Sequence, residues 1–402
     1  MKKSFANVGL CLAICLFSLQ IASAQKAAKT QRTIIIMMDG FGNDYYRNAD
    51  MPNLKQLEKA GIYKVVPSLM PAVTNVNNIA IATGDLPAKN GITGNVFFNP
   101  KTQKEEYIED PGLILTPTIF QRAKKLGVKS ALFSCKKKTV DLMGGFADIS
   151  LCPECDGAGS TIWAKEFGAP PGIYSKEISY WIFKSAIYTI KNNPDLGLIY
   201  IHTTDYPMHM WPPESADAKD FLHHVDEYIG ELRKIAPDAA ILITADHGLN
   251  SKSLCWDLEK ALQARNAPVK IVISPEKDKY VKHHRGMGGA AYVYLNDKKD
   301  LEKVKKTILS LKGVEAVLTR AQAAKRFGLM PERIGDLMVL ADKTTVFGYL
   351  ENAESEQLDA HYRSHGSGFE AHVPLFVYNA NNAPNAAYFK YNYLLAAWMY
   401  RN

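Results

Sequence analysis

The chain of 402 residues carries aspartate and histidine side chains where strongly apolar runs stop. Such runs are typical of strands buried on both faces of a parallel sheet. Ligands of open α/β sheets bind beyond the carboxyl ends of the strands, where these side chains would meet. Mixed aspartate and histidine ligands suit zinc, and two sets of three suit two zinc ions. The residues concerned are Asp39, Asp205, His209, Asp246, His247 and His365.

Asp205 and His209 are four positions apart just after an apolar run. If the chain turns into a helix there, both side chains share a face and can reach one cation. Taken singly, an aspartate after a strand is more often a turn or helix cap. His247 and His365 each precede a glycine, as turn residues do. Because all six residues fall at strand ends or in loops, we favour a two-metal centre over separate structural roles.

The stretch that begins at Thr74 predicts a helix. Apolar residues from Val76 onward form one helical stripe, and Gly84 follows as an end signal. Thr74 could simply be the N-cap of this helix. The N-terminus of a helix also favours a phosphoryl group, and a nearby metal ion would turn a weakly nucleophilic hydroxyl into a nucleophile. The local sequence leaves both roles open.

The elements that must position these residues alternate between apolar, strand-like runs and helical patterns. Helices are predicted at 118–126, 176–191 and 216–235, between the apolar runs. This alternation predicts an α/β sandwich with a mostly parallel central sheet flanked by helices.

The segment 269–340 differs from the rest and is richer in Lys and Glu. Its pattern predicts a strand at 290–295, a charged amphipathic helix at 299–311 and a strand at 314–318. We interpret it as an inserted small α+β cap. The hydrolase-like core would then comprise 25–268 and 341–402.

The N-terminus has the features of a signal peptide. Two lysines precede an apolar run, and Ala22-Ser23-Ala24 supplies small residues for cleavage after Ala24. Residues 1–24 are therefore expected to be removed from a periplasmic or secreted protein with no membrane segment after cleavage. A retained N-terminal anchor is the alternative.

Charge and cysteine content limit the partners. The net charge of +7 comes without a dense Arg/Lys stripe interleaved with aromatic residues, so nucleic acid is not an expected partner. In an oxidising compartment Cys152 and Cys155 could form a local disulfide or remain as two thiols. A zinc knuckle built of cysteines alone would need a second pair.

Five motifs together resemble a known family. Their order is similar to that of the two-zinc hydrolases of the alkaline phosphatase superfamily. Within it they most resemble phosphonoacetate hydrolases, beside the nucleotide pyrophosphatase/phosphodiesterase branch. The motifs are TNVNNIAIATG at 74–84, NGITGN at 90–95, HTTDYPMH at 202–209, TADHG at 244–248 and RSHGS at 363–367.

The resemblance implies two Zn²⁺ per chain, each with its own ligands. His372 is a rival for the last histidine, but His365 lies within the motif RSHGS and is the better match. Asn95 matches a residue that helps to hold the phosphonate oxygens. The implied ligands are Asp205, His209 and His365 for one zinc ion, and Asp39, Asp246, His247 and the Thr74 hydroxyl for the other.

A run of three lysines bears on the substrate. Such a run is ordinarily a solvated face. In an extended chain, however, Lys136 and Lys138 point the same way and Lys137 the other. In phosphonoacetate hydrolases two lysines at this spacing look like the clamp for the substrate carboxylate.

The resemblance thus implies hydrolysis of the C–P bond of phosphonoacetate to acetate and phosphate through a phosphothreonine. The partner would be a small anionic phosphonate or phosphoester, and homodimerisation is left open. The alternatives are a phosphodiesterase or nucleotide pyrophosphatase on the same centre, a hydrolase of a related phosphonate, and a binding protein without turnover. The chain departs from the hydrolase pattern at Val76, where proline is expected, and at Met210, where a further histidine is familiar.

Overall fold

The computed structural model describes residues 31–155, 157–279, 282 and 285–401. The predicted signal peptide, His283 and His284 lie outside these ranges. Within the described part of the chain, no helix combines the length and the apolar character needed to cross a bilayer. Residues from Arg32 onward form one compact unit.

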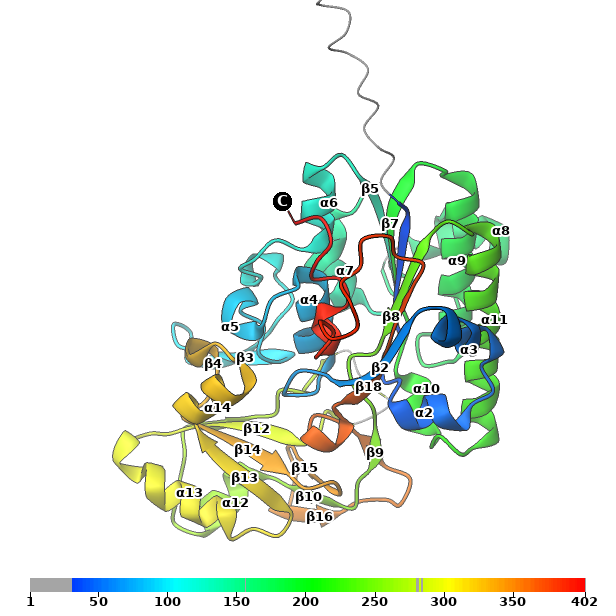
Figure 1. The fold of residues 1–402 in the computed structure, drawn as a ribbon. Coiled ribbons are helices and arrows are strands. Elements are labelled where there is room, and N and C mark those ends of the chain that lie inside the picture. Colours follow the sequence, from blue (N-terminus) through cyan, green and yellow to red (C-terminus); the bar gives the residue numbers. More distant parts are fainter. Residues whose placement is uncertain (1–30, 156, 280–281, 283–284, 402) are drawn as a thin grey trace, which may run out of the picture. The chain divides into compact units, whose positions relative to one another are not determined.

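A seven-stranded sheet with the order β2-β18-β8-β1-β7-β5-β6 forms the centre of this unit (Figure 1). The five strands from β8 to β6 run parallel to one another, and β18 lies antiparallel between β8 and β2. The predicted mostly parallel α/β fold is therefore confirmed. The bounds are β1 (Thr33–Met37), β2 (Ile62–Pro67), β5 (Lys129–Ser134), β6 (Ile149–Leu151), β7 (Leu196–His202), β8 (Ala240–Thr244) and β18 (His372–Tyr378).

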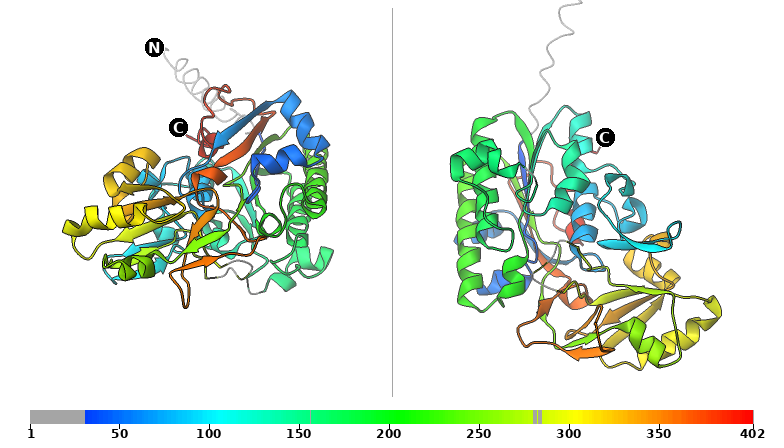
Figure 2. Two further views of the ribbon diagram at one scale, coloured as in Figure 1. Left: turned by 90° about the horizontal axis from the view of Figure 1, so that it is seen from below. Right: turned by 180° about the vertical axis from the view of Figure 1, so that it is seen from behind.

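Helices cover both faces of this sheet, which Figures 1 and 2 show from three directions. One face carries α3 (Pro52–Ala60), α9 (Glu177–Asn192) and α11 (Ala216–Ile235), and the other carries α4 (Thr74–Thr83), α6 (Ile119–Lys125) and α7 (Lys137–Met143). The three long predicted helices correspond to α6, α9 and α11. Strands β1 and β8 are buried along their whole length, which explains why their sequences are apolar rather than alternating.

A second layer contains the predicted cap. Its four-stranded antiparallel sheet, β11-β12-β14-β13, packs against α13, and the predicted helix and strands fall within one or two residues of those observed. Leu258 and Leu262 share a core with Val304 and Val339, so residues before 269 also pack against this sheet. The boundaries 269 and 340 stay a prediction. The bounds are β11 (Ile271–Ile273), β12 (Ala290–Tyr294), β13 (Val314–Thr319), β14 (Leu337–Ala341), α12 (Leu258–Ala264), α13 (Leu301–Leu309) and α14 (Arg320–Phe327).

Shorter elements link the two layers and carry several site residues. Strand β9 pairs with β17, and β10 lies between β15 and β16. The remaining bounds are α2 (Asn43–Asn48), α5 (Pro87–Asn90), α8 (Ile162–Phe167), α10 (Tyr206–Met210), β3 (Val96–Asn99), β4 (Lys104–Tyr107), β9 (Asn250–Ser251), β10 (Leu254–Trp256), β15 (Thr345–Phe347), β16 (Ser355–Gln357) and β17 (Arg363–Ser364).

Candidate active site

The three aspartates converge because the registers of β7, β1 and β8 align their last residues. Asp39, Asp205 and Asp246 follow these strands within three residues and are all buried. The sheet edge therefore gathers three carboxylates from distant parts of the sequence.

Asp205, His209 and His365 form the first group of candidate metal ligands. One ligand atom of each lies within 4.8 Å of the others, and all three residues are buried. Asp205 directly precedes the short helix α10, which contains His209, and Nε2 of His209 lies 3.5 Å from Oδ2 of Asp205. His365 follows β17. The helical turn expected from the four-residue spacing is therefore present.

Asp39, Asp246 and His247 form the second group, with ligand atoms again within 4.8 Å of one another. Nε2 of His247 lies 3.5 Å from Oδ1 of Asp39 and 3.3 Å from Oδ2 of Asp246. The other oxygen of Asp246 accepts hydrogen bonds from the backbone N–H groups of Gly40 and His247, which fixes the carboxylate. The ring of His247 stacks on that of His365, with centroids 3.5 Å apart, so the two groups are neighbours.

The three histidines share one orientation. In each, Nδ1 lies within hydrogen-bonding distance of a backbone carbonyl, so Nε2 is the ring nitrogen left for the group. The contacts are His209 with Arg363 at 2.9 Å, His247 with Gly248 at 3.1 Å and His365 with Ala72 at 2.8 Å.

The electrostatics of the second group favour a cation. Oδ1 of Asp39, Oδ2 of Asp246 and Nε2 of His247 are buried and make no hydrogen bond within the described part of the chain. Burial and then Asp39 raise the pKa of Asp246 well above its usual value. Burial and then His365 lower the pKa of His247 well below its own, which favours the neutral imidazole. Buried carboxylates and a neutral imidazole are donors that zinc binds, so the second group fits a metal ion. In the first group burial lowers the pKa of His365, but the Glu276 carboxylate outweighs burial and raises it, so that group fits a metal ion by its donor types and their closeness.

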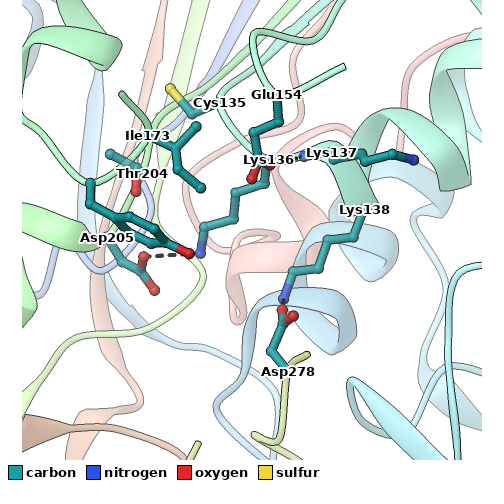
Figure 3. A pocket seen from close by; sticks show the side chains of 10 residues that line it. Cys135, Lys136, Lys137, Lys138, Glu154, Ile173, Thr204, Asp205 and Asp278 are labelled. Carbon is teal, nitrogen blue, oxygen red and sulfur yellow. Dashed lines mark hydrogen bonds and ion pairs between the residues drawn. The ribbon is translucent and has the colours of Figure 1, made fainter. Parts of the chain in front are cut away.

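Lys136 links the two groups. Its Nζ lies 2.6 Å from Oδ2 of Asp39. It also lies 3.0 Å from Oδ1 of Asp205, a contact that Figure 3 shows. Burial lowers the pKa of Lys136, but Asp205 and Asp39 outweigh burial and hold that pKa well above its usual value. The lysine is therefore an ammonium ion in contact with one carboxylate of each group.

Thr74 is the first residue of α4 and is buried. The N-cap residue is Val73, and no side chain caps the helix, so the N-cap role considered for Thr74 is wrong. The segment before it is tied to the first group, because the carbonyl of Ala72 lies against His365 and its N–H donates to Gly366.

Asn95 lies beside the start of α4. Its Oδ1 accepts a hydrogen bond from the N–H of Asn75 at 3.2 Å, and its Nδ2 donates to the carbonyl of Glu276 at 3.2 Å. The amide is thus held on both sides next to Thr74.

The three lysines do not lie in an extended chain. Lys136 is the N-cap of α7 and Lys137 its first residue, so the expected extended alternation is wrong, because β5 ends at Ser134 and the chain turns at once into a helix. Lys136, Lys137 and Lys138 all line one pocket, and the ends of the Lys136 and Lys138 side chains project into it while Lys137 turns away (Figure 3). Nζ of Lys137 forms an ion pair with the carboxylate of Asp141 at 2.5 Å.

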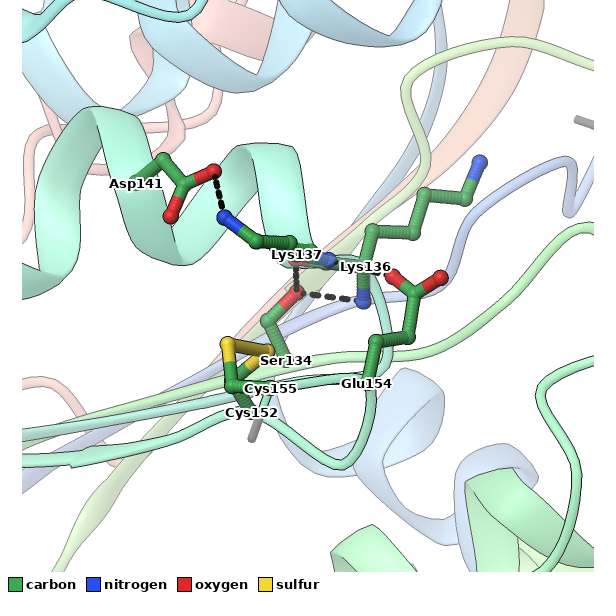
Figure 4. The surroundings of a disulfide bond; sticks show 7 residues. All are labelled: Ser134, Lys136, Lys137, Asp141, Cys152, Glu154 and Cys155. Atoms are coloured by element: carbon green, nitrogen blue, oxygen red, sulfur yellow. Dashed lines mark hydrogen bonds and ion pairs between the residues drawn. A yellow bond between two sulfur atoms is a disulfide. The ribbon is translucent and has the colours of Figure 1, made fainter. Parts of the chain in front are cut away.

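A disulfide lies at the same end of α7. Cys152 and Cys155 are bonded, and Glu154 inside their loop accepts a hydrogen bond from the N–H of Lys137 at 2.6 Å (Figure 4). The loop therefore holds the start of the helix that carries Lys138.

Three further site residues were missed by sequence reasoning. The ring nitrogens of His202 contact the carboxylate of Asp39 at 3.0 Å and the hydroxyl of Ser134 at 2.9 Å. The carboxylate of Glu276 lies 3.0 Å from His365, and that of Asp278 forms an ion pair with Lys138 at 2.6 Å. His202 stands at the start of the motif HTTDYPMH, which was a usable signal, whereas Glu276 and Asp278 fall in a stretch without one. The rival His372 is exposed at the start of β18.

Comparisons with known proteins bear on this site. A family model described as type I phosphodiesterase / nucleotide pyrophosphatase matches residues 33–367. An uncharacterized pyrophosphatase/phosphodiesterase of Schizosaccharomyces pombe is 28% identical over 241 residues, covering 56% of this chain and 46% of that protein. Ectonucleotide pyrophosphatase/phosphodiesterase family member 7 of Mus musculus is 21% identical, covering 60% and 55%. The chain thus spans about half the length of these curated relatives.

Solved structures extend the comparison. Phosphonoacetate hydrolase from Sinorhizobium meliloti 1021, in complex with phosphonoformate, superposes with a TM-score of 0.80 at 30% identity, covering 92% of this chain and 94% of that one. Human ectonucleotide pyrophosphatase/phosphodiesterase 5 gives a TM-score of 0.62 at 16% identity, covering 87% and 88%. The second likeness shows the shared fold alone.

Proposed function

Because the chain belongs to the type I phosphodiesterase / nucleotide pyrophosphatase family, a hydrolase family of the alkaline phosphatase superfamily, we propose that it is a zinc-dependent phosphonoacetate hydrolase. It would split the C–P bond of phosphonoacetate into acetate and phosphate. The observation that carries the proposal is that Lys136 and Lys138 line one pocket with Asp205 of the first group. The 30% identity to the S. meliloti hydrolase over 92% of the chain supports it.

Two zinc ions would be held by the two buried groups, the first by Asp205, His209 and His365 and the second by Asp39, Asp246 and His247, with the Thr74 hydroxyl as a further ligand. When bound, they would supply Lewis-acid charge and lower the pKa of the attacking hydroxyl and water. The three carboxylates and the three Nε2 atoms oriented toward the groups support this assignment.

The start of α4 would bind the phosphonate. Its first N–H groups have no partner within the helix, and the helix dipole favours an anion there. Asn95 holds its amide beside these groups through Asn75 and Glu276, so its remaining N–H can donate to a phosphonate oxygen.

Thr74 would be the nucleophile. Its Oγ forms a bond to phosphorus as the P–C bond breaks, and the bonding pair moves to acetate as an enolate. Lys136 and Lys138 would stabilise this charge, which is larger in the transition state than in the ground state. The proton lost by the hydroxyl balances the one that the carbon takes up, and water then hydrolyses the phosphothreonine to phosphate and free Thr74.

The test is phosphate release from phosphonoacetate, compared with the hydrolysis of bis-nitrophenyl phosphate, by protein of measured zinc content. We expect Lys138→Ala to lower kcat/KM for phosphonoacetate by about 100-fold and to change diester hydrolysis only a few-fold, because only the former develops charge on a carboxylate. Lys137→Ala is the matched control, since that side chain pairs with Asp141 and its backbone N–H is retained. Full phosphonoacetate activity in Lys138→Ala would refute the clamp.

A phosphodiesterase or nucleotide pyrophosphatase on the same centre is the second candidate. The description of the matching family model and the names of the two curated relatives favour it. The departures at Val76 and Met210 are compatible with it as well. A wild-type protein that hydrolyses the diester and leaves phosphonoacetate intact would establish this candidate instead. A panel of related phosphonates in the same assay tests the remaining substrate alternative.

A further inference from the structure

The segment 275–279 of the cap places alternate side chains on opposite sides. Lys277 and Lys279 are exposed and pair with Glu105 and Glu109 near strand β4. The side chains of Glu276 and Asp278 expose only 5% and 6% and face the site. The cap therefore contributes two carboxylates to the catalytic edge of the core.

This segment is fixed to the core at the substrate side. The carbonyl of Pro275 accepts a hydrogen bond from the N–H of Asn95 at 2.7 Å, and the carbonyl of Glu276 accepts one from its side chain. Oε1 of Glu276 lies 3.0 Å from Nε2 of His365. These contacts with Asn95 and His365 therefore also position Asp278, which lies two residues further along the chain.

Asp278 already neutralises one of the two lysines assigned to the substrate. Its Oδ2 lies 2.6 Å from Nζ of Lys138, and the two side chains expose 6% and 8%. Figure 3 shows the ammonium groups of Lys136 and Lys138 projecting into the same pocket, with Asp278 at the end of Lys138. At this depth a carboxylate and an ammonium ion attract each other far more strongly than at the surface.

We infer that Asp278 is a specificity-determining residue: it is the resident counter-ion of Lys138, and a substrate carboxylate must take its place. This inference rests on the proposed function. When a ligand with a carboxylate binds, the pair between Lys138 and Asp278 is replaced by a pair between Lys138 and the ligand. The affinity of the ligand therefore reflects the difference in free energy between these two ion pairs. A phosphoester without a carboxylate leaves the Lys138–Asp278 pair intact. Asp278 thereby sets how strongly the site favours carboxylated phosphonates.

The experiment compares the wild type with Asp278→Asn and Asp278→Ser. Removing the resident carboxylate leaves a buried ammonium that the ligand can neutralise, so we expect KM for phosphonoacetate to fall by about fivefold. KM for bis-nitrophenyl phosphate should fall by less than KM for phosphonoacetate, because the diester has no carboxylate to pair with Lys138. The rise in Tm on addition of phosphonoacetate, which needs no turnover, should be larger in both variants than in the wild type.

Two controls frame the result. Asp141→Asn removes the carboxylate partner of the neighbouring Lys137 and should behave as the wild type. Asp278→Glu keeps a carboxylate and should return KM to the wild-type range. If one of the variants Asp278→Asn and Asp278→Ser does not fold, the other still tests the inference.

An unchanged or raised KM for phosphonoacetate in the folded Asp278 variants would overturn the inference, because Asp278 would then only orient Lys138. If the wild type cleaves phosphonoacetate and the variants show no gain, the inference alone falls. If the wild type is neither active on phosphonoacetate nor stabilised by it, the proposed function falls together with the inference.

Discussion

At the scale of single residues, the site is built from side chains whose second polar atom is already fixed by the backbone. The histidines turn Nδ1 to carbonyl groups, and one oxygen of Asp246 accepts two backbone N–H groups. The remaining ligand atoms of each group thus lie within 4.8 Å of one another before any ligand arrives. Such preorganisation is what lets a site bind a cation without rearranging.

Thr74→Ala should lower kcat/KM by about a thousandfold or more, because no other hydroxyl stands at the start of α4 in the role proposed for Thr74. Thr74→Ser keeps a hydroxyl and should retain part of the activity. The measurement is steady-state phosphate release, combined with acid quenching and mass spectrometry to find a phosphorylated peptide that contains residue 74. Activity of Thr74→Ala near that of the wild type would exclude the phosphothreonine route.

At the scale of elements, the β9–β17 pair and its surroundings hold the two metal groups together. Glu370 accepts hydrogen bonds from Asn250 and Ser367 and pairs with Lys252 at 2.8 Å, and the side chains of this ion pair are fully buried. Burial raises the pKa of Glu370, but Lys252 and the hydrogen bonds outweigh it and bring that pKa below its usual value. The strands that precede His365 and follow His247 are therefore braced by one buried carboxylate.

Glu370→Gln should destabilise the fold by about 3–5 kcal/mol at pH 7, because it leaves the ammonium of Lys252 buried without its counter-charge. Since the folded pKa of Glu370 lies below the unfolded value, its contribution is present above about pH 4.5 and is lost as the pH falls further. The free energy of unfolding of the variant should therefore depend less on pH in that acidic range than that of the wild type. Urea unfolding between about pH 2.5 and 8 measures both effects.

The double variant Lys252→Met/Glu370→Leu removes both charges and should recover part of the lost stability. Equal free energies of unfolding for Glu370→Gln and the wild type would show that this pair does not brace the site.

At the scale of the whole molecule, the carboxylates of Asp39, Asp205 and Asp246 are buried together at one edge of the central sheet. Lys136 supplies one positive charge for these three carboxylates, so the repulsion that remains without metal opposes folding. Bound metal should therefore stabilise the whole compact unit from residue 32 onward.

Removal of metal with a chelator should abolish hydrolysis and lower Tm, and added zinc should restore both. A ligand at a thousand times its Kd adds about 4 kcal/mol of stability, which corresponds to a Tm rise of several degrees. The measurements are elemental analysis and thermal unfolding of the same samples.

His365→Ala should reduce the zinc content from about two ions per chain toward one, by loss of a ligand from the first group. His372→Ala is the matched control and should keep both ions, because His372 is exposed at the start of β18. Loss of zinc in the His372 variant would contradict this ligand set.

Much of the fold and of the site follows from the sequence. Apolar runs without alternation predicted the buried parallel strands. The polar residues just after these runs predicted the sheet edge at which ligands bind. The four-residue spacing of Asp205 and His209 predicted the helical turn that α10 forms. These features are local, because they depend on periodicity and on what ends a strand, and such signals are readable within a few residues.

The tertiary structure decided what has no local signal. Lys138 and Asp278 are 140 positions apart and meet only because the cap folds back onto the core. The start of α7 at Lys137, where an extended chain was expected, depends on the packing around β5 and on the loop that Glu154 shares with the disulfide. Sequence periodicity reports which face of an element is buried, whereas the partner of a buried charge is chosen by distant segments. The sequence alone thus pointed to the candidate metal ligands, and the fold determined how closely they meet and which charged side chains pair with their neighbours.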